Sequence, residues 1–398
     1  MKIGTITFHG ALNFGSALQS YALQEVLKGM GHEVRIIDYR SRDYEQYRFF
    51  QPRHPKMTLR AMRCWRKQSS RKAAFAEFSK KYFRLTKRPY FWKKESDMYE
   101  LAEQFDCFIC GSDQIWNLDC TQGVVGPYFL SFAGDSRRVA YAPSLAHTFF
   151  RPENFDEQLV SDLLSRFDFL SVREEETVPL FQPLVDTPID VVLDPTLLLE
   201  SDDYTDMASK DVLQGEYIFM YLLRECPELI ESTVAMTEAT GMKVAYISEN
   251  NLDIPNSINL FGVGPEEFVS LIAHADLIVT NSFHATVFSV LFHKPFRVYA
   301  TDKSGVRVCA TCWAISGCLT VASTLCVPTM FLLVTGVMWT LFLILCVSIR
   351  GLILERRFRN GRDKPTYQKY RHYRSWRHGN KARVVSSASA LYIGSFHC

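Results

Sequence analysis

Residues 2–37 read KIGTITFHGALNFGSALQSYALQEVLKGMGHEVRII, and this stretch decides the fold class. It begins with KIGTITF, an apolar run that is typical of a short strand. After a turn, Leu18, Tyr21 and Val26 recur at helical spacing. Gly31 then supplies a helix stop signal before a second apolar run, VRII. A strand, a glycine-containing turn, a helix and a strand predict the first unit of a doubly wound α/β domain.

The same alternation continues along the chain. Strand-like runs include FDCFICG, RVAYAPS, FDFLSVR and IDVVLDP, and the polar residues 202–215 separate them from YIFMYLL, KVAYIS and DLIVTNSFH. We therefore expect an α/β protein with two Rossmann-like domains that face each other, residues 1–205 and residues 206–305. Residues 41–100 are rich in Arg, Lys, Tyr and Phe, which predicts an inserted helical pair with a solvated basic face rather than a nucleic-acid surface.

Composition describes an ordinary globular protein, because the 398 residues are 47% hydrophobic and 22% charged, with a formal net charge of +2. This length is enough for two or three domains with a sizeable core. Cys107 and Cys110 form a CxxC within an apolar strand-like run, which favours core thiols over a redox or metal pair. The first residues, MKIGTITFHG, lack the long apolar region of a signal peptide, so we expect a cytoplasmic protein.

Polar residues follow two strands of the first predicted domain. Asn13, Gly15 and Ser16 lie between the first strand and the first helix, where a glycine can let a ligand approach the backbone and helix amides can hold an anion. The structural alternative is a turn with a helix N-cap. The second group is the segment GSDQIWN, which follows the strand FDCFIC and supplies Ser112, Asp113, Gln114, Trp116 and Asn117. Its polar groups and aromatic ring would suit a sugar, although Ser112 or Asp113 could simply cap a helix.

Cationic residues follow strands later in the chain. Arg173 ends the strand FDFLSV and offers a planar fork for phosphate or carboxylate, or else pairs with a glutamate that follows it. Asn281 and Ser282 form a turn, and His284 opens an apolar helix, where it can bind an anion and exchange a proton. A purely structural polar residue in the turn is the alternative. Lys303 adds a second cation at another strand end.

Several of these segments together resemble the polysaccharide pyruvyl transferase family. The segments GALNFGSALQSYALQ, FICGSDQIWN, SVREEET, VLDPTLLL and TNSFHATVFSVLFHKPF occur in the order typical of that family. The resemblance implies a GT-B-like fold and the transfer of pyruvate from phosphoenolpyruvate to a sugar as a ketal. It also implies that Arg173, His284 and Lys303 hold and activate phosphoenolpyruvate, which is a co-substrate, with no other cofactor and no metal. The segments 13–16 and 112–117 would then face the sugar acceptor.

Two rival functions are a glycosyltransferase that uses a nucleotide sugar and a membrane-anchored protein that binds sugars without catalysis. The first would need an acidic residue for a ribose and an aromatic residue for a base in the second domain, and neither stands out. We expect a sugar acceptor as partner and no nucleic acid. A lipid-linked acceptor and a membrane surface facing the basic residues 51–95 both remain open.

The tail departs from this family. Residues 308–349 contain no charged residue, whereas residues 355–383 contain eleven Lys and Arg against two acidic residues. Residues 328–349 are long enough to span a membrane. However, if the reading frame is shifted by one base, one of the readings that the genetic code permits for residues 309–318 has the apolar spacing of a short amphipathic helix and resembles a helix of family members. We therefore predict that residues 306–398 are a frameshift product, which could leave the second domain incomplete and this chain inactive.

Overall fold

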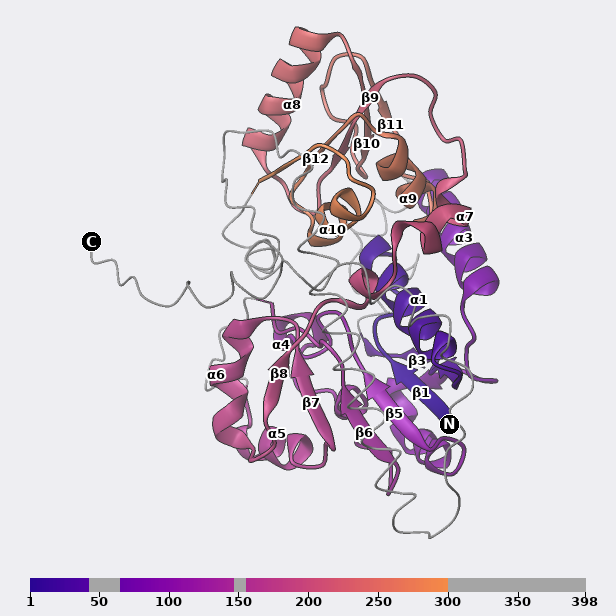
Figure 1. The fold of residues 1–398 in the computed structure, drawn as a ribbon, viewed down its shortest axis with the longest axis vertical. Helices are drawn as coiled ribbons and strands as arrows, with labels where there is room; N and C mark the ends of the chain where they lie inside the picture. The colour runs from indigo at the N-terminus through magenta and orange to yellow at the C-terminus, as the bar shows by residue number, and fades with distance from the viewer. Residues whose placement is uncertain (43–64, 147–154, 300–398) are drawn as a thin grey trace, which may run out of the picture. The chain divides into compact units, whose positions relative to one another are not determined.

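The computed structural model describes residues 1–42, 65–146 and 155–299, and all of them belong to one compact unit of the chain. They form two separate parallel sheets with helices around them (Figure 1). The predicted α/β class with two Rossmann-like domains is therefore confirmed. The boundary predicted between residues 205 and 206 stays a prediction.

The first sheet has six strands in the order β2-β1-β5-β6-β7-β8, and every neighbouring pair is parallel. The order reverses direction at β1, which places a topological switch point between β1 and β5. A separate two-stranded sheet pairs β3 with β4. The strands are β1 (Lys2–Ile6), β2 (Glu33–Ile36), β3 (Tyr39–Arg40), β4 (Tyr90–Phe91), β5 (Cys107–Cys110), β6 (Arg137–Ala140), β7 (Phe169–Val172) and β8 (Ile189–Val191).

Helix α1 (Phe14–Gly29) connects β1 to β2, as the opening sequence predicts. Most of its residues are buried, because it packs against the first sheet and also against helices of the second domain. Gly31 follows the helix at a φ of +86°, a left-handed conformation that glycine adopts without a steric penalty. The other helices around the first sheet are α4 (Leu118–Thr121), α5 (Glu157–Leu164) and α6 (Val178–Phe181), with the 3₁₀ helices η2 (Trp92–Glu103), η3 (Gly126–Phe129), η4 (Glu175–Thr177), η5 (Gln182–Leu184), η6 (Pro195–Leu198) and η7 (Ser201–Tyr204).

The second sheet has five parallel strands in the order β11-β10-β9-β12-β13. Its order also reverses at the first strand in sequence, so β9 lies between β10 and β12. The strands are β9 (Tyr217–Tyr221), β10 (Lys243–Ile247), β11 (Ser257–Asn259), β12 (Leu277–Thr280) and β13 (Phe296–Val298), and the helices are α7 (Thr205–Ala208), α8 (Pro227–Thr240), α9 (Pro265–His274) and α10 (Phe283–Leu291).

Each sheet has its own hydrophobic core. Phe108 and Trp116 are among the fully buried side chains of the first core, and Ile218 and Val279 belong to the second. Cys107 and Cys110 are both buried free thiols, and burial raises their pKa values, to about 12 for Cys107. The interpretation of this CxxC as core thiols is therefore confirmed.

Helix α3 (Trp65–Tyr82) agrees with the predicted solvated basic face at Lys67, Lys80 and Lys81, which are exposed. Arg71 departs from it, because its side chain is buried and donates to the carbonyl of Leu12 at 3.1 Å and to that of Phe261 at 3.3 Å. Near the end of the helix, Lys81 forms an ion pair of 2.6 Å with Glu266 of α9. The helix therefore connects the first domain to the second.

Several predictions fall on residues that the structure does not describe. These are Lys303, the tail 306–398 with its apolar stretch 328–349, and residues 43–64 of the basic segment. Among the residues that are described, no helix combines the length and apolar character needed to cross a bilayer.

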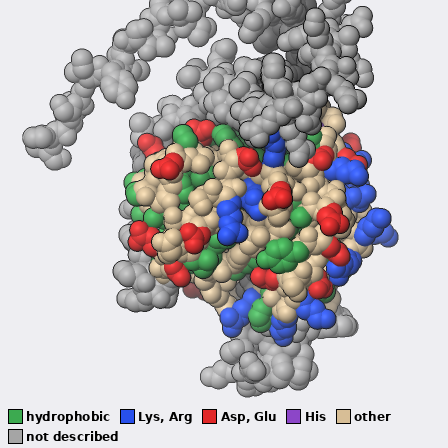
Figure 2. Space-filling view, turned by 90° about the horizontal axis from the view of Figure 1, so that it is seen from below, with side chains coloured by type: hydrophobic (Ala, Val, Ile, Leu, Met, Phe, Trp, Pro, Cys, Tyr) green, Lys and Arg blue, Asp and Glu red, His purple; other side chains and the backbone are tan. Residues whose placement is uncertain are grey.

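On one face of the molecule, acidic and basic side chains are intermingled (Figure 2).

Candidate functional site

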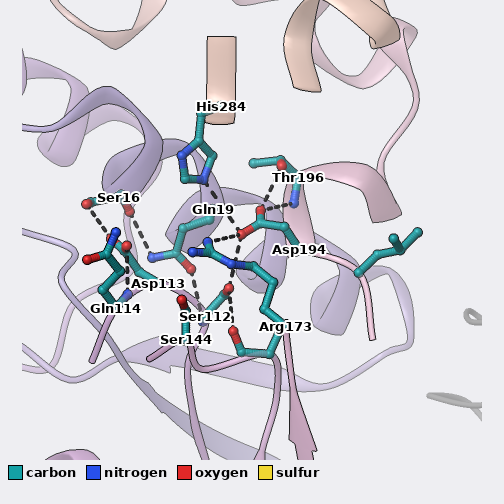
Figure 3. A network of polar contacts seen from close by, with 12 residues as sticks. Ser16, Gln19, Ser112, Asp113, Gln114, Ser144, Arg173, Asp194, Thr196 and His284 are labelled. Carbon is teal, nitrogen blue, oxygen red and sulfur yellow. Dashed lines mark hydrogen bonds and ion pairs between the residues drawn. The ribbon is translucent and has the colours of Figure 1, made fainter. Parts of the chain in front are cut away.

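The carboxyl ends of four strands in the first sheet bring polar side chains together (Figure 3). Strands β1, β5, β7 and β8 end shortly before Thr7, Ser112, Arg173 and Asp194, respectively. All four residues are buried. Because parallel strands end at the same edge of a sheet, this edge is where an α/β fold binds its ligands.

Asp194 lies at the centre of this cluster. Its Oδ1 atom accepts hydrogen bonds from the Thr196 backbone N–H at 3.0 Å and from the Thr196 hydroxyl at 2.7 Å. Its Oδ2 atom accepts from the Ser112 hydroxyl at 3.0 Å and from Arg173 Nη1 at 3.2 Å. Burial alone would raise the pKa of Asp194, but His284, Arg173 and the Thr196 N–H outweigh burial and hold this pKa below its ordinary value. Asp194 is therefore an ionised carboxylate at neutral pH.

His284 reaches this carboxylate from the second domain. Figure 3 shows its ring pointing from α10 toward Asp194, and its Nε2 atom lies 3.6 Å from Asp194 Oδ2. On the other side of the ring is Gly15 in the first turn of α1, where a Cβ atom would lie only 2.0 Å from His284 Nδ1. Only a glycine at position 15 leaves room for the ring. This contact agrees with the prediction that the two Rossmann-like domains face each other.

Arg173 is buried and paired in this structure. Its Nε atom lies 3.2 Å from Glu174 Oε1, its Nη1 atom lies 3.2 Å from Asp194 Oδ2, and its guanidinium lies 4.7 Å from the centre of the Phe283 ring. Burial alone would lower the pKa of Arg173, but Glu174 and Asp194 outweigh it and raise this pKa. The alternative that the sequence left open, pairing with the following glutamate, is therefore what the structure shows, although the pair is buried rather than on the surface.

The predicted residues of the first domain fall into one polar network. Ser16 donates its hydroxyl hydrogen to Asp113, and the Gln114 backbone N–H donates to Asp113 Oδ1 at 2.8 Å. Gln19, on the next turn of α1, accepts a hydrogen bond from the Ser112 backbone N–H at 3.1 Å. This network joins the start of α1 to the end of β5. The structure thus brings Ser16, Ser112, Asp113 and Gln114 together beside Asp194.

Trp116 is not available to stack on a sugar, which corrects the prediction for this residue. Its side chain is 1% exposed, and its ring stacks on Phe129 with centroids 5.0 Å apart. Its Nε1–H donates to the Tyr128 carbonyl at 3.0 Å, so its polar atom is also satisfied inside the core. Asn117 accepts the backbone N–H of Asp119 at 3.0 Å and caps α4, which is a structural role.

Three further predicted residues have structural contacts. Asn13 and Ser282 are the N-caps of α1 and α10, and each accepts a backbone N–H from the first turn of its helix. Asn281 accepts from the Leu223 N–H at 2.8 Å and donates to the Arg224 carbonyl at 2.9 Å, which ties the end of β12 to the segment after β9. The alternatives that assigned these positions to turns and caps therefore account for their contacts.

Sequence reasoning missed the residue that connects the site. Asp194 joins His284 to Arg173, yet we did not select it from the segment VLDPTLLL. The sequence did contain a signal for Asp194. It follows a predicted strand and precedes a proline, and the other candidate residues also follow predicted strands. Gln19 was missed for a different reason, since a glutamine in the middle of a predicted helix carries no such signal.

The arrangement has two chemical capacities. The first turns of α1 and α10 meet at His284, and the N-terminal ends of the two helix dipoles favour an anion there. An imidazole in that position can also donate or accept a proton. Within the described ranges, no three His, Cys, Asp or Glu side chains are grouped so that they could hold a metal ion.

Several solved structures are similar to this chain at low sequence identity. A Neisseria meningitidis UDP-GlcNAc 2-epimerase bound to UDP-GlcNAc is 11% identical, with a TM-score of 0.48 over 88% of this chain and 92% of that one. A putative UDP-N-acetylglucosamine 2-epimerase from Listeria monocytogenes is also 11% identical, with a TM-score of 0.48 over 77% and 80% of the two chains. An E. coli heptosyltransferase with ADP, 11% identical, gives a TM-score of 0.38 over 74% and 86%. No curated protein matches the sequence.

The family comparison is more informative than these structures. The sequence profile of the polysaccharide pyruvyl transferases matches residues 13–303, which is most of the chain and includes every residue of the site described above except Thr7. The match ends at residue 303, so the tail departs from the family. The chain belongs to the polysaccharide pyruvyl transferase family.

Proposed function

We propose that this chain transfers pyruvate from phosphoenolpyruvate to two hydroxyl groups of one sugar, forming a cyclic ketal and releasing phosphate. The sugar would belong to a cell-surface polysaccharide or its precursor, and the reaction would take place in the cytoplasm, where phosphoenolpyruvate is made. The observation that supports this proposal best is the position of His284 between two helix N-termini and next to the ionised Asp194.

The chemistry requires one proton to be added and two to be removed. Protonation of C3 of phosphoenolpyruvate makes C2 electrophilic, and a sugar hydroxyl attacks C2 and loses its proton. The bond from C2 to the phosphate oxygen then breaks, and the second hydroxyl attacks C2 and loses its proton as the ketal ring closes. One hydroxyl proton thus replaces the proton added to C3, and the other leaves on the phosphate. We assign the proton transfer to His284, a role that is typically worth about 10²–10⁴-fold in rate.

The donor carries a phosphate and a carboxylate, so its site needs positive charge. We propose that the N-termini of α1 and α10 provide part of it, together with Lys303. Arg173 contributes charge from beneath the Phe283 ring, but two carboxylates already engage its guanidinium. Arg173 is also buried, so direct contact with the phosphate would require side chains around it to move. The acceptor sugar would lie on the side of Ser16, Asp113 and Gln114.

The test is to measure binding of phosphoenolpyruvate to the full chain by titration calorimetry, followed by phosphate release with a panel of nitrophenyl glycosides as acceptors. We expect wild-type protein to release phosphate with at least one acceptor. His284→Ala should lower that rate at least 100-fold. A His284→Ala variant with full phosphate release would show that His284 does not carry the chemistry. Release of a nucleotide from a nucleotide sugar, with no phosphate from phosphoenolpyruvate, would identify a glycosyltransferase instead.

A further inference from the structure

We infer that Asp194 is a positioning residue that holds a proton on His284 Nε2 and so makes Nδ1 the nitrogen that exchanges protons with the substrate. The inference rests on the proposed function for the role of Nδ1. The position of the proton on Nε2 follows from the geometry of Asp194 and His284 and does not depend on the reaction.

Contacts within the first domain hold the Asp194 carboxylate in place, independently of His284. Asp194 is the N-cap of η6, and both hydrogen bonds from Thr196 hold its Oδ1 atom. With Oδ1 anchored in its own turn, Oδ2 must point toward the end of β5, where the Ser112 hydroxyl reaches it at 3.0 Å. The side chain of Asp194 is fully buried, so solvent does not compete for Oδ2.

His284 presents one nitrogen to this fixed acceptor. The Nε2 atom is buried and lies 3.6 Å from Asp194 Oδ2, slightly beyond hydrogen-bonding distance, and no other described residue bonds to it. An ionised carboxylate can only accept, so a proton on Nε2 is attracted to Oδ2, whereas a bare Nε2 would face a negative charge. Hydrogen bonds of this kind are often long in the free enzyme and tighten when the substrate binds.

The other groups around Oδ2 leave this choice unchanged. Arg173 donates to Oδ2, and Ser112 shares its one hydroxyl hydrogen between Oδ2 and the Ala142 carbonyl, which lies 2.8 Å away. Neither group competes with Oδ2 for the proton of His284. Arg173 also offsets part of the negative charge, which keeps Asp194 from taking the proton of His284 outright. Asp194 therefore orients the ring and its tautomer, as a carboxylate does in a catalytic triad, without itself touching the substrate.

The second nitrogen of the ring then faces the site. His284 Nδ1 lies against Gly15, where the first turn of α1 has no side chain. With Nε2 protonated, the neutral ring carries its lone pair on Nδ1, and the charged ring carries a second proton there. The nitrogen that exchanges protons would thus lie at the N-terminus of α1, where an anion is favoured.

The test is the ¹⁵N spectrum of the full chain, with the signals of His284 assigned by comparison with His284→Asn. In the neutral ring we expect Nε2 to carry the proton and Nδ1 to be bare. A neutral ring with its proton on Nδ1 and a bare Nε2 would overturn the inference. This measurement needs no variant of Asp194, so it remains decisive even if such variants do not fold.

Asp194→Asn tests the role in the reaction. An amide keeps the shape of the carboxylate but cannot stabilise a positive ring, so we expect kcat for phosphate release to fall about 10²–10⁴-fold, while the KM for phosphoenolpyruvate changes less than 3-fold. Thr196→Val is the matched control, because it removes the hydroxyl bond to Oδ1 but keeps the bond of 3.0 Å from the Thr196 backbone N–H, which still directs the carboxylate. It should destabilise the turn without moving the proton from Nε2. A loss of kcat that merely follows the loss of melting temperature in both variants would show a structural role for Asp194.

Discussion

Gly15→Ala is the substitution for which the structure makes the sharpest prediction. A Cβ atom at position 15 would lie 2.0 Å from His284 Nδ1, 2.4 Å from its Cγ atom and 2.5 Å from its Cε1 atom. Ordinary contacts with a Cβ atom begin at 3.4 Å, so the ring must retreat by roughly 1.4 Å. A misplacement of about 1 Å can cost about 10²-fold in rate. We therefore expect kcat/KM for phosphate release to fall about 100-fold.

The same change should not destabilise α1 itself. Gly15 lies inside the helix with no left-handed φ, so alanine fits its backbone and improves helix propensity by up to about 1 kcal/mol. Gly29→Ala is the matched control, because Gly29 is the last residue of the same helix and a Cβ there would meet nothing within 4 Å. It should keep wild-type activity.

The assay measures steady-state phosphate release and thermal unfolding of the wild-type protein, Gly15→Ala and Gly29→Ala. The reasoning predicts that Gly15→Ala loses activity while its melting temperature falls by less than that of a core substitution. Equal activity of Gly15→Ala and Gly29→Ala would refute this reasoning, because it would show that activity does not depend on the position of His284 against α1.

Two further predictions concern the contact between the domains and the core. The pKa of Glu266 is lowered from 4.5 to about 2, because hydrogen bonds from Lys210 and Lys81 outweigh burial, which alone would raise it. Its ion pairs should therefore stabilise the fold fully above pH 4.5, and this stabilisation should be lost as the pH falls through about 2. The lowered pKa corresponds to about 3 kcal/mol in the free energy of unfolding, and the exposure of both lysines reduces this to about 1–2 kcal/mol. Urea unfolding should thus show that Glu266→Gln is destabilising at pH 7 and several-fold less destabilising at pH 2.5, and equal destabilisation at both values would contradict this. Trp116→Phe should lower the free energy of unfolding by about 1–2 kcal/mol, because a buried hydrogen bond and core volume are lost. It should leave the KM for the acceptor unchanged. A raised KM would indicate that Trp116 contacts the sugar after all.

The fold could be predicted from the sequence because it depends on local patterns. Apolar runs such as KIGTITF are followed by helical spacing and a stop at Gly31, and these signals need no knowledge of distant residues. The position of His284 at the start of a helix was predictable for the same reason. Strand ends in a parallel sheet converge, so the rough composition of the site followed from topology.

The contacts within the site could not be predicted, because they join residues far apart in the sequence. Nothing near Gly15 indicates that a histidine 269 positions later will lie against it. Trp116 was assigned to the site because it follows a strand, but that position does not say whether a side chain turns toward the cleft or the core. Phe14, between two selected residues, stacks on Phe268 of α9 with centroids 4.4 Å apart, so it holds the domains together rather than the substrate.

The central claim is that this chain makes a pyruvate ketal. The most direct measurement is a ¹³C spectrum of the reaction of the full chain with [2-¹³C]phosphoenolpyruvate and a sugar acceptor. The account predicts that the enol carbon signal is replaced by that of a ketal carbon bonded to two sugar oxygens, together with one phosphate released for each ketal formed. Wild-type protein that binds phosphoenolpyruvate but yields only free pyruvate and phosphate with every acceptor in the panel would contradict it.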